Sequence, residues 1–198
     1  SLAQIANAAL DAALTGFEFA AGIPGTLGGA VVMNAGAYGG EMKDVLTSVR
    51  VMTEEGEIME LPAEELGLGY RTSIIPEKRY IVLGAVISLT EGKKEEIKAQ
   101  MDDLRQKRVS KQPLEYPSAG STFKRPEGYF AGKLIQDSGL KGFTVGGAQV
   151  SEKHSGFVIN KGNATAADVM ELIRQVTAKV KEDTGVTMEP EVKQIGEF

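Results

Sequence analysis

The stretch from Phe19 to Gly40 constrains the fold most, because it combines many glycines with a complete absence of charge. Eight glycines lie between Gly16 and Gly40, and no charged residue lies between Phe19 and Gly40. Glycine allows positive φ angles and a close approach of backbone amides to a ligand. The segment therefore suits a bulky cofactor with phosphates and flat rings, although a tight loop that packs one element on another has the same composition.

The composition excludes several classes of site. The chain has no cysteine among its 198 residues, which excludes disulfides, thiolate metal sites and a cysteine nucleophile. Its single histidine, His154, excludes a histidine-rich metal site, gives a Ser-His-Asp triad little support, and is assigned no role. The net charge of −5 argues against nucleic acid as the partner. We predict no metal site.

The uncharged segment is long enough to cross a bilayer. Its glycines, Pro24 and Asn34 would be costly there, and no basic flank precedes it, so we expect neither a membrane span nor a signal peptide. Together with the lack of cysteine, this favours a cytoplasmic protein.

Hydrophobic periodicity and turn residues predict an α+β chain, because the elements alternate too irregularly for a doubly wound parallel sheet. The first helix starts without an initiator methionine, so we expect the later part of a longer protein. The expected elements are a helix over 2–13 ended by Gly16, a hairpin of Val45–Met52 and Ile58–Leu61, a strand over Tyr80–Leu89, a helix over Lys93–Val109, an irregular loop over Pro113–Gly128, a helix over Tyr129–Asp137, strands over Thr144–Val150 and Gly156–Asn160, a helix between a Thr165–Asp168 capping box and Gly185, and a last strand over Val186–Ile195.

Three polar sites lie among turn residues rather than on helix faces. Arg71 follows Gly69 and Tyr70 and could clamp a carboxylate with its planar guanidinium; a surface loop arginine is the alternative. Ser121 follows a glycine and precedes two cations, so it could donate a proton or cap local backbone. In Glu189-Pro-Glu191 one carboxylate could reach an interior site, or both could lie at an exposed strand edge.

Taken together, the motifs are far more specific than any one of them. In order they are Gly22-Ile-Pro-Gly-Thr-Leu-Gly-Gly-Ala30, Met33-Asn-Ala-Gly-Ala-Tyr-Gly39, Gly69-Tyr-Arg71, Gly120-Ser-Thr-Phe-Lys124, Leu140-Lys-Gly142, Gly146-Gly-Ala148, Val150-Ser151, Asn160-Lys-Gly-Asn-Ala164 and Glu189-Pro-Glu-Val192. This series closely resembles the UDP-N-acetylenolpyruvoylglucosamine reductase (MurB) family of bacterial cell-wall synthesis. The match runs over essentially the whole chain and over roughly the last two-thirds of the family.

The resemblance implies a fold, a partner and cofactors. We expect residues 1–92 to form the second lobe of a two-lobed FAD-binding domain and residues 93–198 a C-terminal α+β substrate-binding domain. The N-terminal FAD lobe of the full-length protein would be the partner, and the chain alone would not turn over. NADPH would reduce bound FAD, which would then reduce UDP-N-acetylglucosamine enolpyruvate to UDP-N-acetylmuramate.

The resemblance also implies roles for particular residues. Ser121 matches the proton donor, Arg71 the arginine that holds the substrate carboxylate, and Glu191 the glutamate that assists at the enol. The short stretch after Tyr38 and the compact Arg125–Gly132 run resemble the shorter-loop branch, so Lys124, Arg125 and Lys133 are purely electrostatic candidates for substrate binding. The implied flavin-binding residues are Gly22, Ile23, Pro24, Gly25, Thr26, Gly28, Gly29, Asn34, Gly36, Tyr38 and Gly39.

Two other functions compete with this one. Another flavin oxidoreductase of the same cofactor fold could share the glycine-rich segment but would not be expected to keep Ser121, Arg71 and Glu191 together. A non-catalytic UDP-sugar-binding module would bind nucleotide sugar without flavin-dependent turnover.

Overall fold

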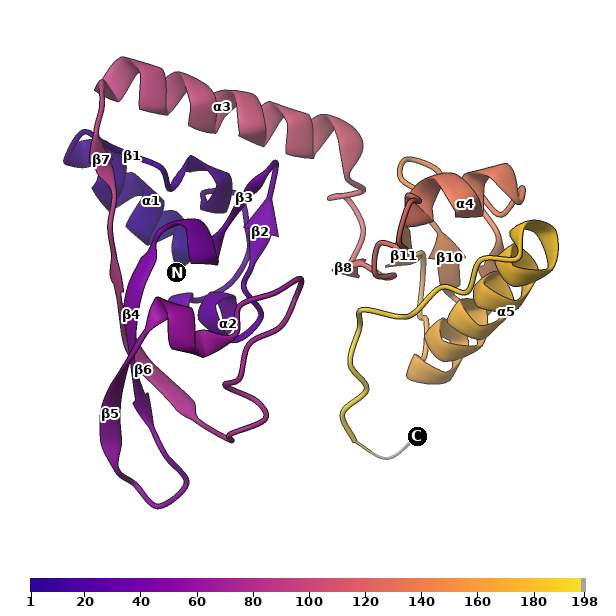
Figure 1. The fold of residues 1–198 in the computed structure, drawn as a ribbon. Coiled ribbons are helices and arrows are strands. Elements are labelled where there is room, and N and C mark those ends of the chain that lie inside the picture. The colour runs from indigo at the N-terminus through magenta and orange to yellow at the C-terminus, as the bar shows by residue number, and fades with distance from the viewer. Residues whose placement is uncertain (197–198) are drawn as a thin grey trace. The chain divides into compact units, whose positions relative to one another are not determined.

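The computed structural model describes residues 1–196 and divides the chain into two compact units. The first unit is Ser1–Arg108 and the second begins at Val109. Each unit has its own hydrophobic core and contains both helices and antiparallel strands (Figure 1). The α+β prediction is therefore confirmed.

The first unit is built around a three-stranded antiparallel sheet of order β5-β4-β6. Two further strand pairs, β1 with β7 and β2 with β3, are two residues long in each strand. The elements are α1 (Leu2–Asp11), β1 (Leu14–Thr15), η1 (Glu18–Ala20), α2 (Leu27–Val32), β2 (Gly36–Ala37), β3 (Gly40–Glu41), η2 (Met42–Asp44), β4 (Leu46–Met52), β5 (Ile58–Pro62), η3 (Ala63–Leu66), β6 (Ile81–Ile87), β7 (Thr90–Glu91) and α3 (Lys94–Lys111).

Alternation along β4 directs one face of this sheet into the core. Val49 and Val51 are fully buried, whereas Arg50 between them is exposed, as the two-residue period of a strand requires. Helix α2 packs against β6, and Val31 of α2 is fully buried in the same core. The predicted hairpin is confirmed, and so is the first helix, although α1 ends at Asp11 rather than close to Gly16.

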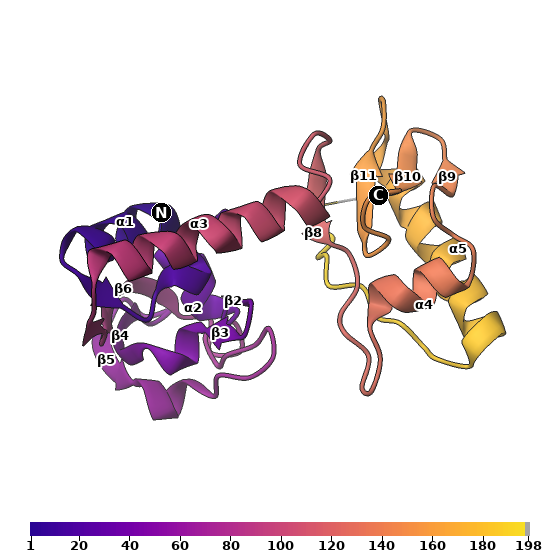
Figure 2. The same cartoon turned by 90° about the horizontal axis from the view of Figure 1, so that it is seen from above.

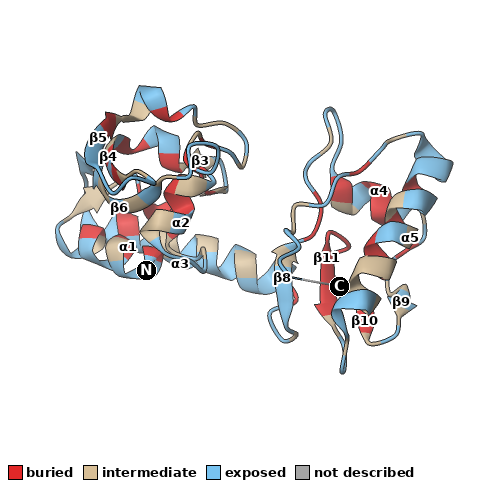
Figure 3. Cartoon of the chain, turned by 90° about the horizontal axis from the view of Figure 1, so that it is seen from below, coloured by how far each residue is buried: buried red, intermediate tan, exposed pale blue. Residues whose placement is uncertain are grey.

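The second unit is a four-stranded antiparallel sheet of order β8-β11-β10-β9 with two helices. Helix α5 packs against β9 and β10, and α4 packs against α5 (Figure 2). Strand β11 is buried over its first three residues (Figure 3). The elements are β8 (Ser118–Ser121), α4 (Ala131–Asp137), β9 (Thr144–Val145), β10 (Ala148–Val150), β11 (Phe157–Asn160) and α5 (Ala166–Thr184).

The ends of α5 agree with the sequence prediction. Thr165 and Asp168 form the expected capping box, in which the Thr165 hydroxyl accepts a hydrogen bond from the Asp168 amide. Gly185 ends the helix with a φ of +74°, a left-handed conformation that favours glycine. These signals are local, so the sequence alone reveals them.

Three strand predictions need correction. The segment 113–128, expected to be an irregular loop, contains β8. The run predicted as one strand over Thr144–Val150 is two short strands separated by a turn at Gly146, whose φ is +52°. The predicted last strand, Val186–Ile195, is reduced to an isolated antiparallel bridge between Phe123 and Pro190. Pro190 has no N–H to extend a ladder at that point.

Helix α3 determines where the two units divide. Ile97 of α3 is buried, and Met101 packs against the core of the first unit. The division therefore falls after Arg108, whereas the sequence-based boundary at residue 92 lies just before this helix. The functional assignment of the two parts stays a proposal.

Two kinds of feature are absent from the part of the chain that the structure describes. No helix within residues 1–196 is long and apolar enough to cross a membrane. Over the same range, no group of three or more His, Asp or Glu side chains could hold a metal ion.

The glycines of the segment 16–40 have two different structural roles. Two of the eight have a positive φ, Gly16 at +115° and Gly39 at +91°. Others permit close packing: a Cβ on Gly36 would lie 2.7 Å from the Gly40 carbonyl oxygen, and a Cβ on Gly40 would lie 2.7 Å from the Phe19 ring. Close packing of the first unit therefore requires glycine at positions 36 and 40, where a side chain would overlap its neighbours.

His154 lies in the turn between β10 and β11. Its Nδ1 accepts a hydrogen bond from the Gly156 amide at 3.1 Å, and its ring lies edge-on to Phe157 with centroids 5.0 Å apart. Burial lowers the pKa of His154 below its ordinary value of 6.5, because desolvation disfavours the charged imidazolium. The structure thus gives this histidine a packing role.

We predict that Gly40→Ala destabilises the protein by about 1–3 kcal/mol, because the new methyl group overlaps the Phe19 ring. Urea unfolding measures this change. Gly25→Ala is the matched control, since nothing lies within 4 Å of its Cβ position, and its effect should stay within about 0.5 kcal/mol. Equal effects of the two substitutions would contradict the packing argument.

We also predict that thermal stability falls as the pH drops below about 6.5 because of His154. The folded state has the lower pKa, so the unfolded state binds the proton more readily. Stability is then full above about pH 6.5 and is lost as the pH falls toward the folded pKa. His154→Gln should flatten this slope in a melting-temperature series. The chain has one histidine, so an unchanged slope would refute the assignment.

Candidate functional site

Ser121 occupies the last position of the edge strand β8, where it is paired with Phe157 of β11. The preceding Gly120 has a φ of +88° with open space around it, a conformation that a side chain would strain. Ser121 is an exposed residue, and its hydroxyl donates a hydrogen bond to the Phe123 carbonyl oxygen at 3.4 Å. A bond of this length is weak, so the hydroxyl can be redirected to a ligand at little cost.

Backbone pairing brings Glu191 next to this strand. The Glu191 amide donates to the Thr122 carbonyl oxygen at 2.8 Å, and the Lys124 amide donates to the Glu189 carbonyl oxygen at 2.9 Å. Thr122 is buried, and its hydroxyl accepts from the Val158 amide at 3.0 Å. The structure therefore brings two of the predicted catalytic residues, Ser121 and Glu191, onto adjacent backbone segments of the second unit.

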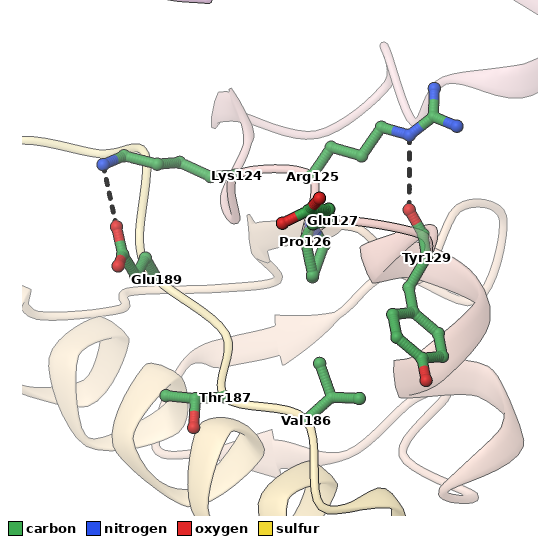
Figure 4. A pocket seen from close by; sticks show the side chains of 8 residues that line it. All are labelled: Lys124, Arg125, Pro126, Glu127, Tyr129, Val186, Thr187 and Glu189. Carbon is green, nitrogen blue, oxygen red and sulfur yellow. Dashed lines mark hydrogen bonds and ion pairs between the residues drawn. The ribbon is translucent and has the colours of Figure 1, made fainter.

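A pocket of about 350 Å³ lies beside this pairing (Figure 4). Both cations that follow Ser121 line it, and two carboxylates balance them. The Lys124 ammonium pairs with the Glu189 carboxylate at 2.9 Å. The lining residues are Lys124, Arg125, Pro126, Glu127, Tyr129, Val186, Thr187 and Glu189.

The three cations predicted to bind substrate are separated by the structure. Arg125 lines the pocket with Lys124, donates from Nε to the Tyr129 carbonyl oxygen at 3.2 Å, and lies over the Phe130 ring at 4.0 Å. Lys133 lies on α4 and pairs instead with Asp137 at 2.8 Å. The pocket thus contains two of the three predicted cations.

Arg71, the third predicted catalytic residue, belongs to the first unit. It lies in a tight turn closed by hydrogen bonds in both directions between Gly69 and Thr72. Its φ is +54°, which is uncommon for a residue with a side chain and costs conformational energy. Its Nη2 donates to the Gly36 carbonyl oxygen at 3.0 Å, and its guanidinium lies 5.0 Å from the centroid of the Tyr70 ring.

The segment predicted to bind flavin divides into exposed and buried positions. Thr26 caps α2 by accepting from the Gly29 amide, while Tyr38 and Gly39, both with positive φ, form the loop between β2 and β3. Asn34 is fully buried. Apart from Asn34, the predicted positions are either exposed or half-buried. The exposed ones are Gly22, Pro24, Gly25, Thr26, Gly29, Tyr38 and Gly39, and the half-buried ones are Ile23, Gly28 and Gly36.

The exposed part of this segment fits a phosphate-bearing dinucleotide. Nothing lies within 4 Å of a Cβ placed on Gly25 or Gly39, so the backbone can be approached closely there. The first amides of α2, at Leu27 and Gly28, have no acceptor within their helix. The segment also has no charge that would repel phosphate. The residues present therefore suit FAD.

Several residues of the two candidate regions carry no assignment from the sequence motifs. Tyr129, Val186 and Thr187 line the pocket, and Glu41 contacts the buried Asn34 side chain. Val186 and Thr187 carry no motif signal, because they reach the pocket only through the path of the chain after α5. Tyr129 and Glu41 stand beside recognised motifs, which is the signal that could have indicated them.

Models of two known families match the two parts of the chain. Residues 1–62 match the FAD binding domain, and residues 112–195 match the C-terminal domain of UDP-N-acetylenolpyruvoylglucosamine reductase. The matched residues contain the exposed glycine-rich segment in the first unit and Ser121, Glu191 and the pocket in the second.

Complete proteins agree with these domain matches. UDP-N-acetylenolpyruvoylglucosamine reductases from Agathobacter rectalis and Caldanaerobacter subterraneus subsp. tengcongensis are 64% and 62% identical over 197 residues. Both matches cover 100% of this chain but 63% and 65% of the relatives, so the chain spans less than two thirds of their length.

A solved structure extends the agreement to the fold. The crystal structure of UDP-N-acetylenolpyruvylglucosamine reductase (MurB) from Thermus caldophilus matches with a TM-score of 0.86 and 42% identity, over 97% of this chain and 68% of that one. A shared fold at this identity, with the site motifs inside the matched residues, shows that the chain belongs to the UDP-N-acetylenolpyruvoylglucosamine reductase family.

Proposed function

We propose that this chain provides catalytic residues for the reduction of UDP-N-acetylglucosamine enolpyruvate to UDP-N-acetylmuramate, with FAD and NADPH as cofactors. The observation that carries the proposal is the backbone pairing that sets Glu191 beside the Ser121 strand, within a chain of this family. We assign the reaction to peptidoglycan synthesis in the cytoplasm, where NADPH and nucleotide sugars are available.

FAD would be held by the exposed glycine-rich segment from Gly22 to Gly39 and would supply the reducing equivalents for the enolpyruvyl double bond. The uncharged surface and the open space at Gly25 and Gly39 support this placement. The amides of this segment would donate hydrogen bonds to the diphosphate. We do not include Asn34 and Gly36 among the residues that contact FAD, because both have structural partners in the first unit.

Ser121 would donate the proton that the substrate carbon next to the carboxylate requires. A neutral hydroxyl can deliver a proton without competing as a base, and its long bond to the Phe123 carbonyl oxygen leaves it easy to redirect. Glu191 would assist by hydrogen bonding to the enol oxygen, where charge develops. Each residue thus acts on a different atom of the same intermediate.

Arg71 would hold the carboxylate of the enolpyruvyl group. The guanidinium offers several N–H donors in one plane, which match the two oxygens of a carboxylate. The positive φ of Arg71 supports a functional requirement, because strained backbone tends to persist where a side chain must be aimed.

The pocket beside Ser121 would take the diphosphate part of the nucleotide sugar. Lys124 and Arg125 provide two positive charges at its wall, and a volume of about 350 Å³ lies within the range of small-ligand pockets. Glu189 would have to release Lys124 from their ion pair. Because that pair is largely exposed, breaking it costs little.

We predict that Ser121→Ala in the full-length protein separates the two half-reactions. Bleaching of the flavin absorbance by NADPH should proceed at the normal rate. Its recovery on addition of the enolpyruvyl substrate should slow by about 10²–10⁴-fold, because that step alone needs the proton. Stopped-flow absorbance measures both rates.

Ser118→Ala is the matched control for this variant, since Ser118 is an exposed serine on the same strand. It should leave both rates unchanged. Equal slowing of both half-reactions by Ser121→Ala would contradict the proton-donor role. Nucleotide-sugar binding without any flavin recovery in the unmodified protein would favour the non-catalytic binding module instead.

We further predict that Gly25→Asp weakens FAD binding by about tenfold or more, since a carboxylate there repels the diphosphate and like charges in contact cost several kcal/mol. Fluorescence titration of the full-length apoprotein with FAD measures this. Gly162→Asp is the control, because Gly162 is equally open and lies in the second unit. Equal affinities of the two variants would exclude Gly25 from the flavin site.

A further inference from the structure

The Asn34 side chain is the most completely buried polar group near Arg71. Its residue is 0% exposed, and its backbone has a φ of +44°. Burial of an amide is unfavourable unless its polar atoms are hydrogen-bonded. A buried asparagine in a left-handed conformation therefore needs partners that compensate for both costs.

The amide group of Asn34 has such partners on two different segments. Its Nδ2 donates to the Glu41 carboxylate at 2.6 Å and to the Gly69 carbonyl oxygen at 3.0 Å. Its Oδ1 accepts from the Lys43 amide at 2.9 Å. An asparagine side chain has two N–H donors, so both are used within the protein.

These two segments are the ones that hold Arg71. Gly69 starts the turn in which Arg71 has its positive φ. Gly36, at the start of the β2–β3 hairpin, provides the carbonyl oxygen that accepts from Arg71 Nη2. Asn34 therefore links the backbone that carries Arg71 to the hairpin that anchors its guanidinium.

We propose that Asn34 is a positioning residue that acts through Arg71, and not a flavin ligand through its side chain. By joining the β2–β3 hairpin to the Gly69–Thr72 turn, Asn34 fixes the direction in which the Arg71 side chain projects from the turn. The functional consequence rests on the proposed role of Arg71 in holding the substrate carboxylate. The structural link does not depend on that role.

Asn34→Asp tests this most directly, because an ionised aspartate has nearly the same shape but no N–H donors. In the full-length protein, the KM for the enolpyruvyl substrate should rise about tenfold or more, within the range found for coupled neighbours. The rate of flavin reduction by NADPH and the affinity for FAD should each change less than about twofold. A parallel loss of FAD affinity would overturn the proposal and assign Asn34 to the cofactor.

Asn7→Asp is the matched control, because it makes the same substitution at an exposed position of α1 in the first unit. The KM should stay unchanged in this variant. Asn34→Asp combined with Glu41→Gln reverses the donor and acceptor between positions 34 and 41. This double variant restores the pairing between positions 34 and 41 but not the hydrogen bond to Gly69. It should therefore recover part of the thermal stability but not the KM, and it carries the test should Asn34→Asp alone fail to fold.

A double-mutant cycle with Arg71→Met separates action through Arg71 from an independent effect. Once Arg71 is replaced, Asn34→Asp should raise the KM no further. Fully additive effects would overturn the proposal, because Asn34 would then act on its own.

Hydrogen exchange provides a measurement that needs no activity. Asn34→Asp should speed amide exchange at Gly69 and Thr72 by at least about tenfold, while exchange in the β4–β6 pairing stays unchanged. Unchanged exchange at both turn amides would overturn the proposal. If Asn34→Asp speeds exchange at these two amides but the unmodified protein has no reductase activity, the proposed function alone is refuted and the structural link stands.

Discussion

The packing of the first unit depends on glycines that let the β2–β3 hairpin approach the core closely. This approach allows the buried Asn34 side chain to form hydrogen bonds with two chain segments. A side chain on Gly36 would collide with Gly40, and one on Gly40 would collide with Phe19. The β2–β3 hairpin can therefore lie directly on the core, and Asn34 can reach both Glu41 and Gly69. Because the hydrogen bonds of Asn34 are shielded from water, losing either partner would leave a buried polar group unsatisfied.

The second unit places its candidate catalytic residues by backbone pairing rather than by side-chain packing. The segment after α5 returns alongside residues 122–124 through two backbone hydrogen bonds around Pro190. Since proline cannot continue a ladder, the pairing stays short and the flanking chain can diverge. Glu191 is thereby held beside the Ser121 strand, while Thr187 and Glu189 form part of the pocket wall.

Local signals in the sequence predicted the regular elements well. The capping box at Thr165, the left-handed Gly185 and the apolar alternation of β4 each act over a few residues, so they are visible without a structure. Strand β8 carries no such signal, because Ser118-Ala-Gly-Ser is neither alternating nor apolar. It is a strand because it pairs with the buried strand β11, which is a tertiary effect.

In the candidate site, too, some features follow from sequence motifs and others only from the tertiary structure. The positions of Ser121, Arg71 and Glu191 follow from recognised motifs in a fixed order, and Lys124 and Arg125 follow directly from Ser121. Lys133 was predicted to join these cations, yet in the structure it pairs with Asp137 on α4, one helical turn away. An (i, i+4) pair is easily missed when charge alone guides the choice.

The sequence by itself determined the family, the α+β class, the two ends of α5 and the motifs of the candidate site, because these depend on residue identity and short-range spacing. Only the tertiary structure decided that Asn34 is buried between the β2–β3 hairpin and the Gly69 turn, and that Glu191 is tied to Thr122. Asn34 and Gly69 are 35 positions apart in the chain, and Thr122 and Glu191 are 69 positions apart. Contacts of that separation arise from packing of the whole unit, which no local pattern encodes.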